Sequence, residues 1–343
     1  MTNNDKTVCA LTFAYNAEKT LGRCVDSVLG QGYENLVYYV CDDGSQDSTR
    51  QIINKYAKED DRVTPIYIDD KSRSLIDLIP DLISTILMER DDGYFVSIDA
   101  DDEYKPDFLE KMLPFVTGNG LDLAICGSES ASASTGDFIS RKKLGYDLIL
   151  TGKGFSEFFP VYRRYLYDFW GKVYAFPAMK KAYVSFRRRR SAVKGRVSEL
   201  FNYEVLRASE KVGLFGESLH KYYICPDSYT AKFIPGHIEA SIHVYDAARE
   251  FLLSHGELSK ANQDYLYAIY LGHISEVLDR LYKADMPESE KLPYISRILD
   301  CQLTKELLAY DADPQYRNLA ARKEFLAGIE NRIAEGCWAA QDG

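Results

Sequence analysis

Two groups of acidic side chains in the first third of the chain could carry chemistry. The first lies in the stretch "SIDADDEYKPDFLEKM", where Asp99, Asp101, Asp102 and Glu103 crowd directly behind an apolar run. Like charges this close repel one another, and removing them from water costs free energy unless a positive charge lies among them. A divalent cation would relieve the repulsion. The alternative is that the acids stabilise the N-terminus of a helix beginning at Pro106.

The second group lies in the stretch "CDDGSQDS", which contains Asp43. Both groups follow short apolar runs with the composition of strands, at residues 36–41 and 94–98. Ligands of open parallel sheets bind beyond the carboxyl ends of the strands, so this placement favours a binding site. The alternative for the second group is a plain turn in which Ser45 or Asp47 caps the following helix.

The elements that must position these acids alternate between strand-like and helical patterns, which predicts a mostly parallel sheet with crossover helices. Helices are expected behind Asn16 and behind Ser45, each a candidate N-cap. Pro80 is expected to kink or break the third helical stretch. The five strand-like runs cover residues 7–13, 36–41, 63–68, 94–98 and 121–126.

The later part of the chain differs in composition. The middle is irregular and rich in aromatic and basic residues, and the end consists of amphipathic helical patterns. Four helices fit in the last part, with breaks expected near Gly256, Pro287 and Pro314, and their apolar stripes are candidates for contact between copies of the chain. The expected parts are residues 1–126, 127–235 and 236–343.

Composition limits the classes of partner. The chain has 343 residues and a formal net charge of −10, which argues against general nucleic-acid binding and favours small molecules or sugars. Its seven cysteines are far apart and odd in number, as expected for reduced thiols in the cytoplasm. We find neither a signal peptide nor an 18-residue apolar span, so a cytoplasmic location is expected.

Three motifs, in order, resemble the nucleotide-sugar-binding half of a bacterial family 2 glycosyltransferase. The stretch "TFAYNAEKTLGRCVDSVLGQGYENL" is similar to the first strand and helix of that family, "DDGS" to the end of its second strand, and "DADD" with Pro106 and Leu109 to its fourth. The resemblance is close over residues 5–115 and looser over 165–230. It implies an α/β GT-A nucleotide-diphospho-sugar transferase fold, here with an all-α C-terminal extension.

The resemblance also implies roles for the acids. Asp101 would bind Mg²⁺ or Mn²⁺, with Asp102 as the alternative ligand, and Asp99 would orient the ribose or the donor sugar. Asp43 would accept a hydrogen bond from N3–H of uracil. A hard cation held by one or two carboxylates suits the charge of a nucleoside diphosphate leaving group.

Other positions match the family less well. Phe13 stands where the family has a proline at the first strand, and Tyr15 opens the matched helix entry; both are assigned to the nucleotide side. The family's G-x-x-x-A-R-N segment is missing, which leaves Arg73 as the candidate contact to the diphosphate. Trp170 and Lys172 are assigned to the acceptor side, although Trp170 is equally suited to the core.

The general base is the main departure. An inverting enzyme needs one base to take the proton of the acceptor hydroxyl. Where the family has an aspartate three residues before a phenylalanine, this chain has Ser198, with Glu199 beside it. Glu199 is therefore the predicted base, and the alternative is an ordinary acid on a solvated helix face.

A basic run could attract an anionic acceptor such as a lipid diphosphate, or the inner face of the plasma membrane. The alternative is a solvated basic loop. The run consists of Arg187, Arg188, Arg189 and Arg190.

These observations predict metal-dependent, inverting transfer of a sugar from a nucleotide-sugar, a UDP-sugar above all, to a hydroxyl group of a glycan or lipid-linked acceptor, as in surface polysaccharide synthesis. One alternative is a catalytically silent protein that binds sugar nucleotides or acts as a scaffold. Another is a nucleotidyltransferase, which would need a basic, glycine-rich loop after the first strand. The stretch "FAYNAEKTLG" offers none.

Overall fold

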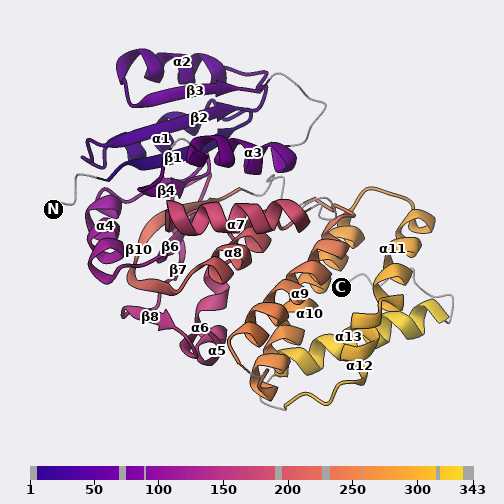
Figure 1. The fold of residues 1–343 in the computed structure, drawn as a ribbon. Coiled ribbons are helices and arrows are strands. Elements are labelled where there is room, and N and C mark those ends of the chain that lie inside the picture. Colours follow the sequence, from indigo (N-terminus) through magenta and orange to yellow (C-terminus); the bar gives the residue numbers. More distant parts are fainter. Residues whose placement is uncertain are drawn as a thin grey trace. The chain divides into compact units, whose positions relative to one another are not determined.

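The computed structural model describes residues 6–68, 75–88, 90–189, 195–225, 232–256, 258–313 and 317–334 (Figure 1). Its strands are β1 (Val8–Ala14), β2 (Leu36–Asp42), β3 (Val63–Tyr67), β4 (Tyr94–Ser97), β5 (Glu103–Tyr104), β6 (Leu123–Ser132), β7 (Phe138–Lys142), β8 (Leu148–Thr151), β9 (Lys172–Ala175) and β10 (Lys211–Ile224). Its helices are α1 (Leu21–Leu29), α2 (Thr49–Glu59), α3 (Leu75–Met88), α4 (Phe108–Asn119), α5 (Gly154–Glu157), α6 (Phe159–Tyr162), α7 (Phe176–Arg189), α8 (Val197–Ala208), α9 (His237–Ser254), α10 (Lys260–Lys283), α11 (Glu288–Asp300), α12 (Gln302–Ala309) and α13 (Arg317–Ala334), with a short 3₁₀ turn η2 (Arg163–Tyr165).

The described strands form one mixed sheet in which spatial order differs from chain order. The order is β3-β2-β1-β4-β9-β6-β10-β5, with β7 beside β6 and β8 beside β10. The part from β3 to β4 is parallel, as the alternating pattern predicts. Strand β9 then enters antiparallel between β4 and β6. The chain segment that leads into β9 therefore lies at the edge where β4 ends.

The central parallel strands β1 and β4 are buried because helices cover them, whereas β3 at the outer side of the sheet is partly exposed. Every residue of β1 is buried except Phe13. Helix α1 presents Leu21, Cys24, Val25 and Val28 to the core, at the spacing that places them on one helix face. Packing therefore explains the local patterns that predicted these elements. Four of the predicted strand ranges agree with the observed ones within one residue, whereas β6 extends six residues beyond the predicted range 121–126.

Helix α3 corrects one expectation. It continues through Pro80, so the helix does not break there, and a kink at Pro80 stays a prediction. A proline inside a helix removes one backbone hydrogen bond. The residues that follow, Ile83, Ile86 and Leu87, are buried, and α3 packs beside α7. This apolar contact offsets the lost hydrogen bond.

The expected N-caps Asn16 and Ser45 are also wrong. Helix α1 begins after Thr20 and α2 after Ser48. Asn16 adopts a left-handed backbone, its side chain accepts a hydrogen bond from the Gln46 amide, and its own amide donates to the Ser45 hydroxyl. These side chains join the loops after β1 and β2 to each other, because the two loops lie side by side at the end of parallel neighbours.

The chain forms two compact units, which are described separately. Unit 1 comprises Met1–Gly154, Val161–Ser191 and Phe201–Cys225, and contains the sheet. Unit 2 comprises Phe155–Pro160, Ala192–Leu200 and Pro226–Gly343. The division into residues 1–126, 127–235 and 236–343 stays a prediction.

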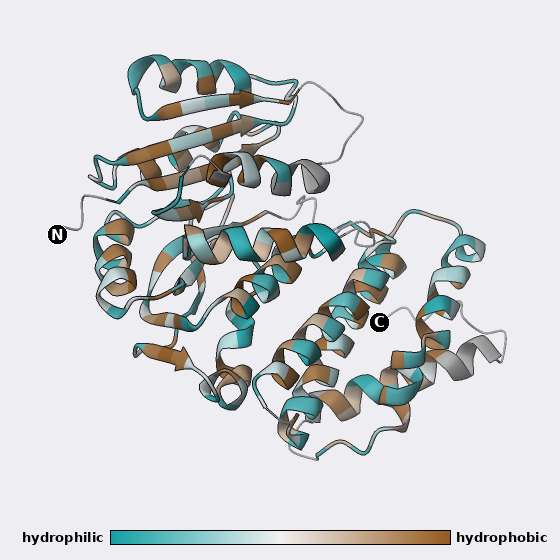
Figure 2. Cartoon of the chain, in the orientation of Figure 1, coloured by the Kyte–Doolittle hydropathy of each residue, from teal (hydrophilic) through white to brown (hydrophobic). Residues whose placement is uncertain are grey.

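Unit 2 holds the C-terminal helices, whose apolar stripes are visible in Figure 2. Helix α10 lies at their centre and contacts α9, α11 and α13. The described part of this region has five helices rather than the expected four, because the backbone becomes extended at Cys301 and separates α11 from α12. The breaks near Gly256 and Pro287 are confirmed, whereas Pro314 lies outside the described residues.

Among the described residues, no helix combines the length and the apolar character needed to cross a bilayer.

Candidate active site

The two acidic groups meet at the end of the sheet where the parallel strands β2, β1 and β4 terminate. This end is called the sheet edge below. Strand β1 lies between β2 and β4, and because all three run parallel their carboxyl ends share this edge. Asp43 directly follows β2, and Asp99 lies two residues beyond β4. Neighbouring strands are about 4.8 Å apart, so roughly 10 Å separate β2 from β4 across β1. The site is built on strand ends, which hold side chains more rigidly than free loops do.

The adjacent acids of "DDGS" have different surroundings. Asp42 is buried, and its carboxylate accepts hydrogen bonds from the Ser45 amide at 3.0 Å and from Nε of Arg50 at 2.8 Å. Burial acts to raise the pKa of Asp42, but the hydrogen bonds from Ser45 and Arg50 outweigh it and hold that pKa below its usual value. Asp43 is half-exposed at the next position. Asp42 thus stabilises the turn, and Asp43 is the acid placed to meet a ligand.

The residues expected on the nucleotide side lie at the same edge. Phe13 is half-buried near the end of β1, and Tyr15, directly after β1, is 57% exposed. An exposed aromatic ring beside a carboxylate suits a planar base. Arg73 lies outside the described residues.

The backbone of the "DADD" turn is held from both sides. The hydroxyl of Thr12 donates to the carbonyl of Ile98 at 3.0 Å, and a guanidinium nitrogen of Arg23 donates to the carbonyl of Asp101 at 2.5 Å. The Asp102 amide closes the turn by donating to the carbonyl of Asp99 at 3.1 Å. The acids are therefore presented by a preorganised backbone.

The acids of this turn are close enough to raise one another's pKa. The Asp99 side chain reaches solvent. Even so, the surrounding protein removes part of the water around its carboxyl group, which raises the pKa of Asp99 well above the usual value. The negative charges of Asp102, Asp101 and Asp168 raise it further. Burial also raises the pKa of Asp101, although Arg23 acts against it. Such mutual repulsion is what a bound cation would relieve.

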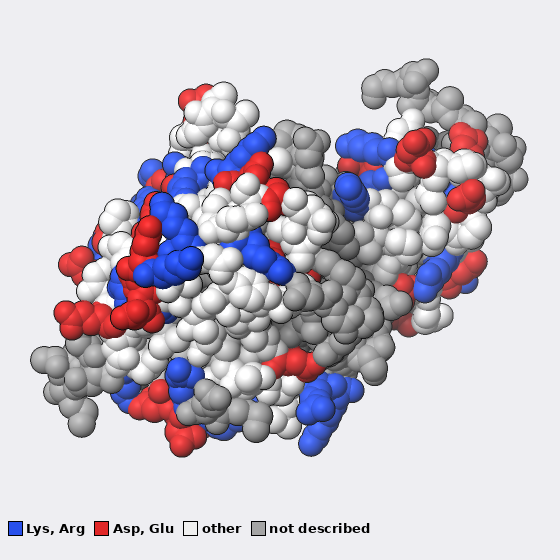
Figure 3. Space-filling model, turned by 90° about the horizontal axis from the view of Figure 1, so that it is seen from above, with Lys and Arg blue, Asp and Glu red and all other residues white. Residues whose placement is uncertain are grey.

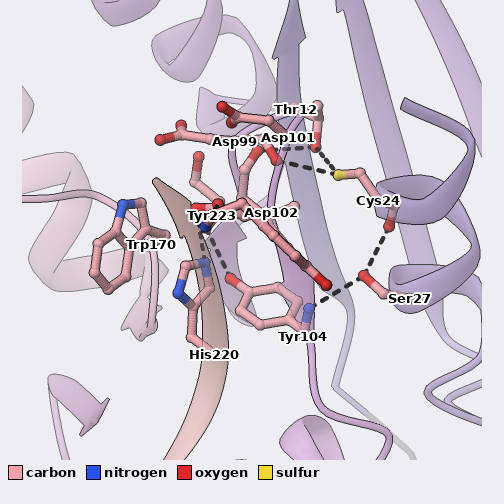
Figure 4. A network of polar contacts seen from close by, with 12 residues as sticks. Thr12, Cys24, Ser27, Asp99, Asp101, Asp102, Tyr104, Trp170, His220 and Tyr223 are labelled. Carbon is pink, nitrogen blue, oxygen red and sulfur yellow. Dashed lines mark hydrogen bonds and ion pairs between the residues drawn. The ribbon is translucent and has the colours of Figure 1, made fainter. Parts of the chain in front are cut away.

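Asp102 is engaged inside the protein (Figure 4). It is fully buried, one carboxylate oxygen accepts the Tyr223 amide at 2.9 Å, and the other lies 3.2 Å from Nε2 of His220. Burial and the charge of Asp101 raise the pKa of Asp102 well above its usual value. Asp101, which is only half-buried, is therefore the better placed of the two for a metal ion.

A stacked pair of rings supports Asp102. The imidazole of His220 lies 4.1 Å from the Trp170 ring, nearly parallel to it, as Figure 4 shows. His220 is completely buried, and burial lowers its pKa to about 3, against the opposing charge of Asp168. The imidazole is therefore neutral at physiological pH.

The residues expected on the acceptor side are buried. Trp170 is 9% exposed and Lys172 is 1% exposed. The Lys172 amine donates to the carbonyls of Asp168 and Trp170. Burial lowers the pKa of Lys172 to about 7, although the negative charge of Asp168 acts against this shift. These side chains shape the segment 166–170, and direct contact with an acceptor stays a prediction.

Two site residues escaped the sequence analysis, His220 on β10 and Asp168 before β9. Both reach the acidic turn because β9 and β10 belong to the same sheet, far along the chain from β4. The available signal was the nearness of Asp168 to the "WGK" segment that already resembled the family.

Glu199, the predicted general base, belongs to unit 2. It is 1% exposed and its carboxylate lies 3.8 Å from Arg196 and 3.6 Å from Nε2 of His273. Arg196 is in turn paired with Glu276 at 2.6 Å. Buried ionic partners of this kind favour a structural role, and the catalytic role of Glu199 stays a prediction.

The basic run lies at the end of α7. Arg187 and Arg188 are exposed, while the Arg189 side chain and Arg190 lie outside the described residues. On the face shown in Figure 3, basic and acidic side chains are interspersed. Membrane or lipid contact through this run stays a prediction.

Comparison with known proteins identifies the family. The sequence profile of "Glycosyl transferase family 2" matches residues 9–183, just over half of the chain. The chain belongs to glycosyl transferase family 2. Membership in this family favours sugar transfer over the nucleotidyltransferase alternative.

Curated relatives in the family come from bacteria. TuaG of Bacillus subtilis, named for teichuronic acid biosynthesis, is 34% identical over 117 residues, which are 34% of this chain and 44% of TuaG. The glycosyltransferase GlyA of Streptococcus pneumoniae is 27% identical over 228 residues, which are 64% of this chain and 31% of GlyA. The chain thus spans less than half the length of either relative.

Solved structures of S. aureus TarS share the fold of this family 2 chain. One superposes with a TM-score of 0.61 at 15% identity, covering 97% of this chain and 54% of TarS. TarS 1-349 in complex with UDP-GlcNAc gives a TM-score of 0.57 at 14% identity, covering 98% of this chain and 94% of that one. The expected α/β fold of GT-A type with a helical C-terminal region is confirmed.

Proposed function

We propose that this family 2 enzyme transfers a sugar, with inversion, from a UDP-sugar to a hydroxyl group of a glycan or lipid-linked acceptor. The observation that carries the proposal is the meeting of Asp43 with Asp99 and Asp101 at one edge of the sheet. A nucleotide-sugar carries a base at one end and a diphosphate in the middle. The base needs a polar partner, and the diphosphate needs another. TarS structures hold UDP and UDP-GlcNAc, which supports a uridine donor.

The donor would lie across the ends of β2, β1 and β4. The Asp43 carboxylate accepts the N3–H of uracil, and the exposed ring of Tyr15 lies beside the base. Asp99 accepts hydrogen bonds from hydroxyl groups of the ribose or the donor sugar, since an ionised carboxylate is an acceptor only.

The residues present suit a divalent cation. Among the described residues, no three His, Cys, Asp or Glu side chains form a group able to hold a metal ion by themselves. Mg²⁺ and similar ions use one or two carboxylates and complete their shell with phosphate oxygens and water. Asp101 would be the main protein ligand. When bound, the cation would stabilise the charge that develops on the leaving diphosphate.

The relatives support a proposal for the class of product. TuaG is named for teichuronic acid biosynthesis, and the proposal for this chain is likewise the synthesis of a surface polysaccharide. Because the chain spans only part of that relative, its acceptor is proposed as a class, a glycan or lipid-linked sugar.

We expect UDP with Mn²⁺ to raise the midpoint of thermal unfolding. A ligand present at a hundredfold its dissociation constant stabilises the folded state by about 2.7 kcal/mol. Differential scanning fluorimetry would compare UDP with CDP and GDP, each with and without Mn²⁺. CDP lacks the N3–H donor and is the matched control. A shift with CDP as large as that with UDP would contradict the uracil assignment, and no shift with any of them would favour the silent scaffold.

We expect Asp43→Ala to weaken UDP binding about tenfold to a hundredfold, because a hydrogen bond to a charged group contributes roughly 1.5 to 3 kcal/mol. Calorimetric titration would measure the dissociation constant. Asp61→Ala is the matched control, since Asp61 is exposed just before β3, at the amino-terminal ends of the parallel strands and away from the proposed site. Equal affinity of wild type and Asp43→Ala would refute the assignment.

A further inference from the structure

The register of β9 brings a third acid to the candidate active site. In the antiparallel pair of β4 and β9, Tyr94 lies opposite Ala175 and Phe95 opposite Tyr174. Continuing this register past the end of β4 places Asp99 level with Trp170. Adjacent strands are about 5 Å apart, so Asp168 emerges next to the acidic turn.

The electrostatic surroundings agree with that placement. The negative charge of Asp168 contributes to the raised pKa of Asp99 and to that of Asp102. It also acts on His220 and Lys172. Asp168 is therefore within electrostatic range of both sides of the turn.

The backbone of Asp168 is held firmly while its carboxylate is left available. Its carbonyl accepts hydrogen bonds from the Lys172 amine and, at 2.9 Å, from the side-chain amide of Asn202. Asn202 is completely buried and is itself fixed by the Tyr174 hydroxyl at 2.8 Å. Within the described part of the chain, no hydrogen bond or ion pair engages the half-exposed Asp168 carboxylate.

The order of acids along the sheet edge matches an in-line displacement. From one side to the other it runs from Asp43 after β2, through Asp99 after β4, to Asp168 before β9. A donor with its base near Asp43 and its sugar and diphosphate near the turn of Asp99 and Asp101 would have Asp168 on the side away from the base. An inverting reaction needs its base on that far side of the anomeric carbon.

The position that supplies the base in the family is Ser198 here, and its neighbour Glu199 is buried among ionic partners. Asp168, by contrast, is half-exposed.

We propose that Asp168 is the general base of the transfer reaction. The proposal rests on the proposed function, because it presumes a nucleotide-sugar donor at the sheet edge. The acceptor oxygen forms a bond to the anomeric carbon while the bond from that carbon to the diphosphate oxygen breaks. The acceptor proton passes to the Asp168 carboxylate, and the nucleoside diphosphate leaves with the bonding electron pair.

Donor turnover in Asp168 variants tests the proposal. The donor is the UDP-sugar of a panel that gives the largest thermal shift with Mn²⁺, water is the acceptor, and UDP release is measured. We expect Asp168→Asn to lower turnover about a hundredfold to ten-thousandfold, the usual contribution of a general base. UDP affinity and the unfolding midpoint should stay close to those of wild type. Asp137→Asn, an exposed acid before β7, is the matched control.

Azide separates a base from a merely structural residue. Azide is already an anion and needs no deprotonation, so sodium azide should restore UDP release in Asp168→Ala and yield a glycosyl azide of inverted configuration. A structural defect would not be rescued in this way. The proposal is overturned if both Asp168 variants turn over like wild type, or if azide fails to rescue a variant that still binds UDP.

Glu199→Gln distinguishes the rival base. Loss of turnover in this variant with rescue by azide would assign the base to Glu199 and overturn the proposal for Asp168. Failure of wild type to bind UDP in the thermal-shift experiment is a separate result, because it removes the proposed donor and not the choice of base.

Discussion

Asp101→Asn is expected to lower kcat/KM for the nucleotide-sugar about a thousandfold and to abolish the effect of Mn²⁺ on UDP binding. A cation that stabilises the leaving diphosphate contributes several kcal/mol to the transition state, and a neutral amide holds it poorly. Asp101 is half-buried at the turn after β4, with its backbone fixed by Arg23, so the amide would occupy the same position. Electron paramagnetic resonance of free Mn²⁺, with UDP present, would measure the lost binding directly.

Asp102→Asn is the matched control for this prediction. An asparagine at position 102 can still accept the Tyr223 amide and donate to Nε2 of His220, so the buried contacts are kept. Mn²⁺ binding should therefore persist in Asp102→Asn and be lost in Asp101→Asn. The reverse pattern would show that Asp102 is the ligand, the alternative that the sequence left open.

Lys172→Met is expected to remove a pH dependence of stability. Burial lowers the pKa of Lys172 to about 7, whereas an exposed lysine in the unfolded chain titrates near 10.4. Between pH 7 and about 10.4, the Lys172 amine is protonated in the unfolded chain but not in the folded protein. The free energy of unfolding of wild type therefore gains up to about 1.4 kcal/mol per pH unit from Lys172 as pH rises. Below pH 7 both states are charged and Lys172 destabilises the fold most, by roughly 5 kcal/mol relative to a neutral group.

Urea denaturation of both proteins between pH 6.5 and 8.5 measures this effect. Burial raises the pKa of Cys24 and that of Cys126 to about 12, which opposes the lysine trend at the alkaline end of the range. The opposition from Cys24 is common to wild type and Lys172→Met, so it cancels in their difference. The charge of Lys172 itself lowers the pKa of Cys126, so the contribution of Cys126 differs between the two proteins. The gap between the two stability curves should narrow or change sign as pH rises. Parallel curves would show that Lys172 keeps its proton in the folded state.

Local pattern was enough to predict five of the ten strands of the described sheet, namely β1, β2, β3, β4 and β6. Runs such as residues 36–41 and 94–98 form strands because apolar, β-prone residues between turn signals have few other ways to be buried. The helices of the C-terminal part followed from their apolar stripes in the same way. The error at Cys301 arose because neither glycine nor proline marks that break.

At Asn16, Ser45 and Pro80, contacts with distant parts of the chain outweigh the local sequence signal. Asn16 and Ser45 have the chemistry of caps, but the adjacent loop offers them backbone partners that a single chain segment cannot reveal. Pro80 has the chemistry of a helix breaker, but buried residues further along α3 hold the helix together.

The sequence by itself determined which acids follow which strands, and therefore that Asp43 and Asp99 reach one edge of a parallel sheet. Only the tertiary structure decided what each acid can do. Asp102 is paired with His220, Glu199 with Arg196, and Asp168 arrives on an antiparallel strand. The physical reason is that the charge, solvation and partners of a carboxylate depend on residues distant in the chain, and spacing along the chain does not encode them.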